Sequence, residues 1–319
     1  IENIPKDDNG YSVAIGNFDG MHLGHQSVID IARKTRDKSS VGVVTFEPHP
    51  RQYFQKNHSI FRLMKSETRK RFLESFKVDA LFELPFDYSL ANLSPKDFVE
   101  TVLLEKLNVR NIVVGPDFRF GKNREGSVNL LKSYQEKKKL GLHIANPFMI
   151  EGKVVSSSEL RKKLAEGSVI EVTRMLSRYY EIDGIVEKGF QRGRKLGFPT
   201  INIGLKNTIV PKHGVYAVLI KILSNNKQRT LKGAASIGSR PTYGDYEPNI
   251  EVFIFDFDEN LYGAYVSISL VKFIRPELKF NSEVELISQM KEDCRIIKDY
   301  LDNDSVSYTH LTLPTKASV

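Results

Sequence analysis

The sequence predicts an α/β + β fold: a parallel-sheet, Rossmann-like domain at residues 1–178, followed by an antiparallel β-barrel at residues 179–303. Three observations support this fold class. A chain of 319 residues is longer than one hydrophobic core usually serves. The first half alternates strand-like and helix-like segments, as in a parallel sheet covered by helices. In the second half, short strand-like runs follow one another with Gly, Pro, Asn and Asp turns between them, which is typical of a barrel or sandwich.

The elements of the first half can be placed in order. Short apolar or β-branched runs predict strands at residues 12–15, 41–46, 78–84 and 111–114. Helices are expected between or after them, at residues 26–34, 95–107 and 157–176. Ligands of such sheets bind beyond the carboxyl ends of the strands, so we expect a site in the loops that follow these strands.

The second half contains a series of strand-like runs and one helix. The runs lie at residues 180–186, 214–220, 231–237, 251–255 and 265–273. A helix from Ser282 to about residue 301 is expected to close the domain, because its apolar side chains share one stripe. The stripe consists of Leu286, Ile287, Met290, Cys294 and Ile297. Residues 304–319 fit neither pattern and resemble a translated sequencing-library adaptor, so we expect a non-native tail.

Composition narrows the class of protein. Lysine and arginine outnumber the acidic residues by 47 to 39, an excess that suits an enzyme that holds phosphates. The basic residues are scattered and lack the aromatic-rich pattern of RNA-binding sheets, so a nucleic-acid partner is not expected. No apolar run approaches the roughly 20 residues of a membrane helix, and no membrane partner is expected. The single cysteine and the lack of a charged-then-apolar leader predict a cytoplasmic protein.

The sharpest motif of the first half is a glycine-rich loop between the first predicted strand and the first predicted helix. Gly16, Gly20 and Gly24 let the backbone approach a bulky anion, and the helix that follows aims its free N–H groups at that anion. His22 and His25 are three residues apart in the first helical turn, so both can donate hydrogen bonds to charge that builds up on a phosphate. The loop therefore predicts a nucleotide-phosphate site.

Two other interpretations of the histidine pair stay open on sequence grounds. The pair could bind a metal, and Asp19 is the one further ligand near in sequence. The segment could also be a purely structural turn, although a turn has no need of a second histidine.

Residues 16–26, Gly-Asn-Phe-Asp-Gly-Met-His-Leu-Gly-His-Gln, resemble the HxGH signature of the adenylyl- and cytidylyltransferase superfamily. The longer run is similar to the FAD synthetase branch of that superfamily. The resemblance implies a Rossmann-like nucleotidyltransferase domain in which His22 and His25 are catalytic. It also implies that Phe18, Asp19 and the loop glycines bind ATP or its phosphates.

Two further segments resemble elements of the same family. Ser157, Ser158 and Arg161 match its Ser/Lys-rich mobile loop, where hydroxyls, helix N–H groups and an Arg would hold a triphosphate. Taken alone, that run is a good helix N-cap. The segment 115–121, Gly-Pro-Asp-Phe-Arg-Phe-Gly, matches a third element, which implies that Asp117, Phe118 and Phe120 line a flavin or nucleotide pocket.

The second half carries its own phosphate-loop candidate. Gly193, Arg194 and Gly197 belong to a glycine-rich basic run that is not a Walker A loop, because Gly-Lys-Ser/Thr is missing. Thr200 and Asn202 follow in an extended segment and point to the same face, since side-chain direction repeats every two residues. Their hydroxyl and amide oxygens suit Mg²⁺. The alternative is a basic turn before an ordinary edge strand.

The whole second half is similar to riboflavin kinase. Supporting segments lie at residues 189–203, 211–216, 237–244 and 274–280. The resemblance implies that Glu251 is the base toward the ribityl hydroxyl and that Arg275 lies in the flavin or nucleotide pocket. Read without the resemblance, Glu251 is an edge residue that opens an aromatic strand. Phe253 stands where the family usually has His and Ser236 where Asn is common, and we expect neither to touch the metal pair or the base.

The two resemblances together identify the chain as a member of the bifunctional riboflavin kinase/FMN adenylyltransferase family. The resemblance implies phosphorylation of riboflavin to FMN and adenylylation of FMN to FAD, with ATP as co-substrate, Mg²⁺ as cofactor and pyrophosphate as product. The partners are then riboflavin, FMN, FAD and ATP. Two rivals stay open: a nucleotidyltransferase for another phosphorylated small molecule, and a basic nucleic-acid-binding protein. The oligomeric state, a homo-oligomer included, is left open.

Overall fold

The computed structural model describes most of the chain: residues 7–55, 60–137, 139–189, 193, 196–224, 229–242 and 245–303, without the side chains of 239–247. The chain forms two compact units. Unit 1 consists of Ile1–Ser59 and Ser66–Ser156, and unit 2 of Ile60–Lys65 and Ser157–Val319. Arg194 and the expected tail 304–319 lie outside the described residues.

The division between the units differs from the expected boundary near residue 178. The segment predicted as one helix at 157–176 forms two helices, α7 (Ser157–Glu166) and α8 (Val169–Leu176). The helical backbone is interrupted between them at Gly167, whose φ of +79° a helix cannot accommodate. Helix α8 packs on strands of the second half, so this segment groups with unit 2.

Unit 1 is built on a five-stranded parallel sheet in the order β3-β2-β1-β4-β7, which confirms the parallel α/β fold. The sheet strands are β1 (Tyr11–Ile15), β2 (Ser40–Glu47), β3 (Ala80–Pro85), β4 (Val109–Val114) and β7 (Gly141–Ile144). The helices are α1 (Leu23–Lys34), α2 (Pro50–Phe54), α3 (Ser66–Ser75), α4 (Tyr88–Ala91), α5 (Pro95–Asp97), the π-helix η1 (Phe98–Lys106), the 3-10 helix η2 (Lys122–Arg124) and α6 (Val128–Glu136). Two short hairpins complete the unit, β5 (Arg119–Phe120) with β6 (Gly126–Ser127) and β8 (Met149–Ile150) with β9 (Lys153–Val154). The four strands predicted in this half are all present, and β7 was not predicted.

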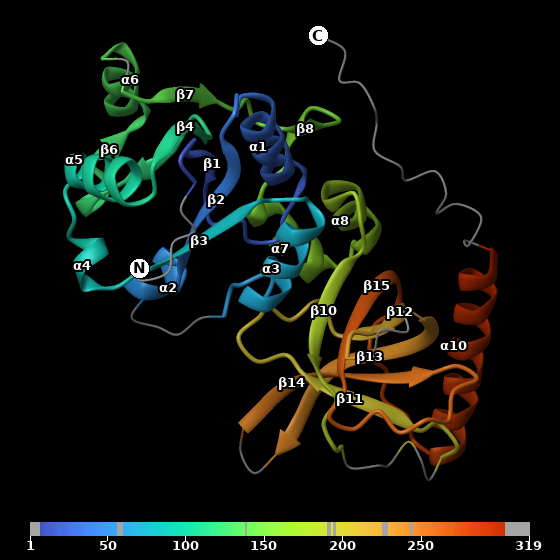
Figure 1. The fold of residues 1–319 in the computed structure, drawn as a ribbon. Helices are drawn as coiled ribbons and strands as arrows, with labels where there is room; N and C mark the ends of the chain where they lie inside the picture. Colours follow the sequence, from blue (N-terminus) through green and yellow to red (C-terminus); the bar gives the residue numbers. More distant parts are fainter. Residues whose placement is uncertain are drawn as a thin grey trace. The chain divides into compact units, whose positions relative to one another are not determined.

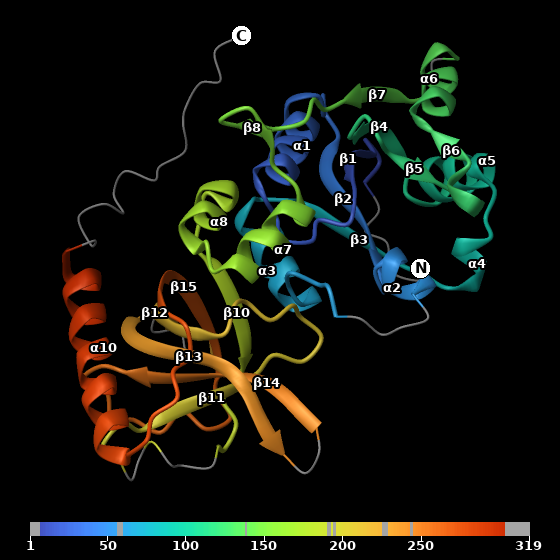
Figure 2. The same cartoon turned by 180° about the vertical axis from the view of Figure 1, so that it is seen from behind.

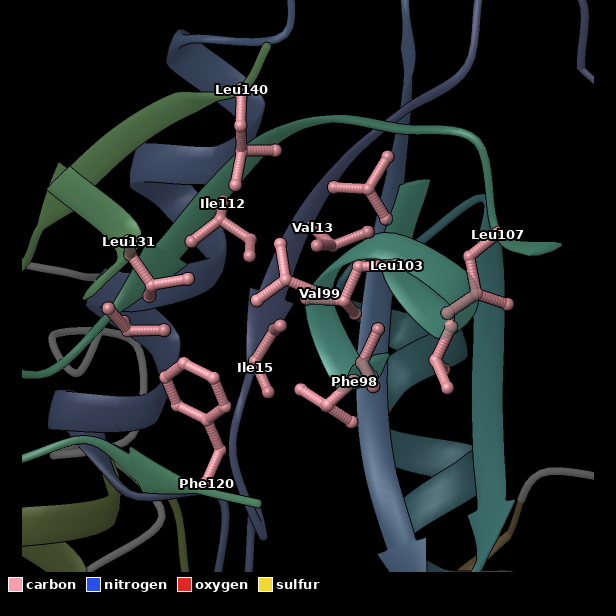
Figure 3. Close-up of a cluster of buried hydrophobic side chains, with 14 of the residues drawn as sticks. Val13, Ile15, Phe98, Val99, Leu103, Leu107, Ile112, Phe120, Leu131 and Leu140 are labelled. Carbon is pink, nitrogen blue, oxygen red and sulfur yellow. The ribbon is translucent and has the colours of Figure 1, made fainter. Parts of the chain in front are cut away.

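Helices cover both faces of this sheet, which explains why all five residues of β1 are buried. Val13 and Ile15 point to one face, where they pack with residues of η1 and α6 (Figure 3). The alternate residue Ala14 points to the opposite face, where α1 contacts β1, β2 and β4 (Figure 1). The segment predicted as one helix at 95–107 is instead α5 followed by η1.

The order of the strands predicts where unit 1 binds ligands. From the central strand β1, the chain moves to β2 and β3 on one side and then crosses to β4 and β7 on the other. The carboxyl ends of β1 and β4 therefore flank the switch point, and crevices at such points are the usual ligand sites of open α/β sheets. The glycine-rich loop follows β1, and the segment 115–121 follows β4.

Unit 2 is a six-stranded antiparallel sheet in the order β10-β15-β12-β13-β14-β11, and its β class is confirmed. The strands are β10 (Tyr180–Ile185), β11 (Thr200–Gly204), β12 (Gly214–Ile222), β13 (Thr230–Thr242), β14 (Asp245–Ile254) and β15 (Tyr265–Arg275). The two ends of the sheet meet at one bridge between Glu187 and Asn202, where the Glu187 amide donates to the Asn202 carbonyl at 2.8 Å. This bridge curls the sheet into a barrel-like form.

Helix α10 (Glu283–Asn303) covers part of this sheet, as the apolar stripe predicts (Figures 1 and 2). Ile297 and Leu301 pack against residues of β12 and β15 in a small core. Leu286, Met290 and Cys294, one to three turns earlier, line a cavity, and Cys294 also packs against this core. Within the described part of the chain, no helix combines the length and the hydropathy needed to cross a membrane.

A six-residue segment, Ile60–Lys65, belongs to unit 2 although it lies between elements of unit 1 in sequence. The Leu63 carbonyl accepts a hydrogen bond from the Tyr180 hydroxyl at 2.6 Å, and the Arg62 carbonyl accepts one from the Ile209 amide at 2.8 Å. The segment is thus bonded into the barrel unit, a connection that local sequence patterns do not reveal.

Candidate functional site

The two histidines of the glycine-rich loop lie against each other. Their ring centroids are 3.7 Å apart with planes 21° from parallel, so the structure brings the predicted pair together. His22 is the N-cap of α1, and its Nδ1 accepts a hydrogen bond from the backbone N–H of His25. Because Nδ1 is the acceptor, the ring proton of a neutral His22 resides on Nε2, which can donate to a ligand.

The backbone of this loop is held in an unusual conformation. Phe18, Gly20 and Met21 have φ values of 50°, 93° and 47°, in the left-handed region that non-glycine residues rarely adopt. The Gln26 side chain donates to the Met21 carbonyl at 2.9 Å, which pins the loop to the helix. Strain that the surroundings hold in place is common at functional sites, and this loop fits that pattern.

Two predicted phosphate-binding residues of the loop are buried. Asp19 is 2% exposed, and Phe18 packs with its ring centroid 5.2 Å from that of His25. Phe18 therefore packs against the His25 ring. A Cβ on Gly24 would lie 3.0 Å from the His22 ring, so a larger residue at this position would displace that ring.

A cavity of about 1030 Å³ lies at the carboxyl ends of four strands of unit 1. Its lining includes Gly16 after β1, Phe46 in β2, Phe86 after β3 and Asp117 after β4, so it occupies the switch point of the sheet. The three residues that the resemblance assigns to a pocket, Asp117, Phe118 and Phe120, are all on its wall.

The walls of this cavity are largely aromatic. Phe118 and Phe120 are stacked with centroids 5.3 Å apart, and Phe86 makes edge contacts with Tyr53 and Phe54 at 5.4 and 5.8 Å. An apolar cleft of aromatic rings suits a large planar ring system as its ligand. Tyr53, Phe54 and Phe86 lie outside the recognised motifs, so local sequence patterns do not reveal their place on this wall.

The third predicted element of the nucleotidyl site lies in unit 2. Ser157 and Ser158 are the first two residues of α7. The Arg161 Nε donates to the carbonyl of Phe61 at 2.6 Å, and the guanidinium lies 5.4 Å from the Phe61 ring centroid. The triphosphate role of these three residues stays a prediction.

A second cavity, of about 530 Å³, lies in unit 2. It is lined by three residues that the sequence analysis singled out, Thr200, Glu251 and Arg275. These residues are far apart in sequence, and the sheet places them on one wall. The cavity also receives Phe198 and residues of α10.

The register of β11 and β14 places the predicted metal pair beside the predicted base. Asn202 is directly opposite Glu251 and Thr200 is directly opposite Phe253. Direct cross-strand partners share a face, so all four side chains lie on one face of the sheet. Strand β14 lies between β13 and β11, so Glu251 is in the interior of the sheet, and the reading of Glu251 as an edge residue is wrong.

The same register corrects a second expectation. Phe253 and Ser236 were expected to touch neither the metal pair nor the base. Phe253 is the direct cross-strand partner of Thr200, and Ser236 is that of Glu251. Each of these two pairs joins residues of different strands, so the spacing of residues in the sequence does not predict them.

Two glycines of the phosphate-loop candidate are required for different reasons, close packing at Gly193 and backbone conformation at Gly197. A Cβ on Gly193 would lie 2.3 Å from the Phe198 carbonyl oxygen and 3.6 Å from the Thr200 hydroxyl oxygen, so the loop passes close to Thr200. The Gly193 carbonyl accepts hydrogen bonds from the amides of Leu196 and Phe198 at 3.0 and 2.8 Å. Gly197 has a φ of +86°, which favours glycine whatever the space around it.

Arg275 is held in place by a carboxylate that the sequence analysis missed. Asp293 of α10 is 4% exposed and accepts from Arg275 Nε at 2.9 Å and from Nη2 at 2.6 Å. Gln289 Nε2 donates to the same carboxylate at 2.9 Å. A buried acid on an otherwise apolar stripe was the available signal, since buried charges are usually paired.

Comparison with known families matches both halves of the chain. Residues 4–159 match the FAD synthetase family, and residues 176–301 match the riboflavin kinase family. The bifunctional riboflavin kinase/FMN adenylyltransferase of Buchnera aphidicola subsp. Schizaphis graminum is 34% identical over 307 residues, which covers 95% of this chain and 97% of that enzyme. The chain belongs to this bifunctional family.

Other members and one solved structure agree with that assignment. The Bacillus subtilis enzyme of the same name is 35% identical and covers 93% of this chain and 95% of its own. The Escherichia coli (strain K12) enzyme is 34% identical and covers 89% and 90%. The crystal structure of a macrolide-efflux protein from Streptococcus pneumoniae has a TM-score of 0.79 at 30% identity and covers 92% of this chain and 94% of that one. The resemblance inferred from the two sets of motifs is confirmed.

Proposed function

We propose that this chain makes FAD from riboflavin in two ATP-dependent steps, with FMN as the intermediate, and that each unit carries one step. Membership of the bifunctional family supports both activities. The assignment of one step to each unit rests on the two cavities. The cavity of unit 1 is lined by residues of the nucleotidyltransferase motifs, and that of unit 2 by residues of the kinase motifs. The barrel unit phosphorylates riboflavin, and the parallel-sheet unit adenylylates FMN.

In the barrel unit, Glu251 accepts the proton of the terminal ribityl hydroxyl as its oxygen attacks the γ-phosphate of ATP. The P–O bond to the β-phosphate breaks, and ADP leaves. Two observations support this role: Glu251 lines the cavity, and it is the cross-strand neighbour of Asn202. A positioned general base contributes a rate factor of about 10²–10⁴. Arg275, fixed by its ion pair with Asp293, lines the same cavity.

Thr200 and Asn202 would hold Mg²⁺ in this unit. Their hydroxyl and amide oxygens are hard ligands on one face of β11. The Asn202 amide oxygen accepts a long hydrogen bond, 3.5 Å, from the Asn249 amide. Two neutral oxygens suit an ion that keeps its remaining positions for phosphate oxygens and water. When bound, Mg²⁺ neutralises charge on the ATP phosphates.

In the parallel-sheet unit, an FMN phosphate oxygen attacks the α-phosphate of ATP. The bond to the bridging oxygen breaks, and pyrophosphate leaves with that oxygen. His22 donates from Nε2 to the negative charge that develops, and the stacked His25 acts with it. The aromatic cavity holds the flavin ring with Phe118 and Phe120 on its wall.

We also propose that the protein works in the cytoplasm, where ATP is available and a chain with one cysteine needs no disulfide.

The test is a product analysis of the purified chain. Riboflavin, ATP and Mg²⁺ should yield FMN and then FAD with pyrophosphate, and FMN with ATP should yield FAD directly. Chromatography of the flavins reports both steps. Formation of neither FMN nor FAD would overturn the proposal. Adenylylation of a different phosphorylated small molecule, with FMN refused, would favour the rival nucleotidyltransferase.

A further inference from the structure

We propose that Arg119, Lys122 and Arg124, here called the rim cations, make the aromatic cavity of unit 1 selective for phosphorylated flavin over riboflavin. The inference rests on the proposed function, since it concerns the flavin that enters this site. A chain that handles riboflavin and FMN needs two flavin sites that differ in preference. The two flavins share their ring system and differ in one phosphate group, so charge is the property that distinguishes them.

The rim cations lie on the wall of the cavity, on the segment that follows β4. Arg119 is in β5, and Lys122 and Arg124 are in η2. All three are exposed, and within the described part of the chain none of them forms an ion pair with a carboxylate. Among the described residues, four cations line this cavity, Arg51 included, against one carboxylate, Asp117.

The turn that carries Lys122 and Arg124 has a strained backbone, and residues outside the turn hold it in place. Gly121, Asn123 and Arg124 have φ values of 70°, 53° and 59°. The Lys122 amide donates to the Leu93 carbonyl at 2.8 Å, and a Cβ on Gly121 would lie 2.8 Å from Pro95. Residues in such conformations persist only where the surroundings hold them. The turn therefore fixes the backbone positions from which Lys122 and Arg124 project at the cavity wall.

The cavity of unit 2 has the opposite balance of charge. Among the residues that the structure describes, two cations line it, Arg275 and Lys279, against three carboxylates, Glu251, Glu277 and Asp293. Arg275 is already paired with Asp293. Riboflavin is neutral, so the lining carboxylates do not repel it. FMN carries a phosphate of roughly −1.5 to −2 charge at neutral pH, which these carboxylates repel. The sign of the lining charge thus separates the two flavins: the barrel cavity disfavours its product, and the aromatic cavity attracts it.

The rim cations act through their combined field, and no single contact to the phosphate is assigned to any of them. Clefts lined by one sign of charge raise the local concentration of the oppositely charged ligand. Exposed charges are screened within about 8 Å at physiological ionic strength, so the preference for FMN should weaken as salt rises. Salt dependence therefore separates this mechanism from shape recognition.

The test is the variant Arg119→Gln/Lys122→Gln/Arg124→Gln in the full chain, assayed for FAD formation from FMN and ATP. We expect KM for FMN at low salt to rise roughly tenfold with little change in kcat, because three exposed charges each contribute modestly. The neutral competitor is 5′-deoxyriboflavin, which cannot be phosphorylated. Its inhibition constant should stay within about twofold of wild type, since it has no charge for the rim to attract.

Two further variants complete the design. Lys38→Gln/Lys106→Gln/Lys132→Gln removes the same charge from exposed positions of unit 1 away from the cavity and should leave KM for FMN unchanged. Arg119→Lys/Arg124→Lys keeps the charge and should stay near wild type. Riboflavin phosphorylation in each variant checks that the chain is folded.

An unchanged KM for FMN in the rim variant would overturn the proposal, as would a parallel rise in the constants for FMN and 5′-deoxyriboflavin. A wild-type chain that forms no FAD from FMN would instead refute the proposed function, so the two failures are distinct.

Discussion

Glu251 lies directly opposite Asn202 in the antiparallel ladder of β14 and β11, so the proposed base and one proposed metal ligand are nearest cross-strand neighbours. Cβ atoms of such pairs are about 4.5–5.5 Å apart, close enough for both side chains to reach one phosphate acceptor and its metal. Local sequence patterns do not reveal this relationship, because the two residues are 49 positions apart in the chain.

Glu251→Gln should abolish most FMN formation from riboflavin while FAD formation from supplied FMN persists. The amide keeps the size of the side chain and removes the group that accepts the proton, so the kinase rate should fall by about 10²–10⁴. Steady-state assays of the two steps measure the split. Glu259→Gln, an exposed acid of the same unit, is the control. A wild-type kinase rate in the Glu251 variant would mean that the base is elsewhere.

Thr200→Val should slow the same step in a way that raised Mg²⁺ partly restores. The hydroxyl is a weak single ligand, so its loss lowers metal affinity more than it alters the chemistry. Thr200→Ser retains the hydroxyl and should need no extra Mg²⁺. The measurement is the kinase rate across a Mg²⁺ titration. If the Val variant has the wild-type Mg²⁺ dependence, Thr200 is not a metal ligand.

His22→Ala with His25→Ala should stop FAD formation and leave FMN formation intact. Both rings lie in the loop after β1, and loss of transition-state hydrogen-bond donors costs about 10²–10³ in kcat per donor. Flavin chromatography reports the two products. A parallel fall in FMN would contradict the assignment of one step to each unit, provided that the melting temperature is unchanged.

Glu83→Gln should lower the stability of unit 1 at neutral pH and have less effect in acid. Burial opposes ionisation of Glu83, but hydrogen bonds from Ser66, Arg69 and Lys70 outweigh it and lower its pKa below 4.5. Arg69 is 1% exposed and also contacts Glu47, so loss of one partner should cost about 1–3 kcal/mol.

The sign of the pH effect follows from the lowered pKa. The stabilisation by Glu83 is present above its ordinary pKa of 4.5 and is lost as the pH falls through the folded-state pKa. Urea unfolding of wild type and variant should therefore converge in acid. Glu74→Gln, an exposed acid of α3, is the control. A difference in stability that stays constant down to acid pH would exclude an ionised Glu83 as its source.

Cys294 should report occupancy of the barrel cavity. Burial, together with the neighbouring Asp293, raises the pKa of its thiol to about 11. At neutral pH the thiolate fraction is then roughly a hundredfold below that of an ordinary cysteine, so alkylation should be slow and should accelerate as pH rises. Because Cys294 lines the cavity, riboflavin should slow the alkylation further. Mass spectrometry of the single cysteine measures both effects. Equal labelling with and without saturating riboflavin would place the flavin elsewhere.

Several features of this protein could be predicted from local sequence patterns. The alternation of strands and helices, the barrel-type series of runs and the stripe of α10 follow from side-chain periods of 2 and 3.6 residues, which nearby residues alone determine. The stacked pair His22 and His25 was predictable for the same reason, because residues three apart meet on one helical turn. The two sets of motifs also identified the family before the fold was known.

The remaining features depended on contacts between residues distant in sequence, and only the tertiary structure decided them. Glu251 is interior to the sheet, it pairs with Ser236, and Phe253 pairs with Thr200 because of the register of β11, β13 and β14. The ion pair between Asp293 and Arg275 forms because α10 packs against the end of β15. The aromatic cavity and its rim cations arise because parallel strands bring the loops at their carboxyl ends to one edge of the sheet. Local patterns specify which way a side chain points along its own element, whereas packing between elements decides which side chains it meets.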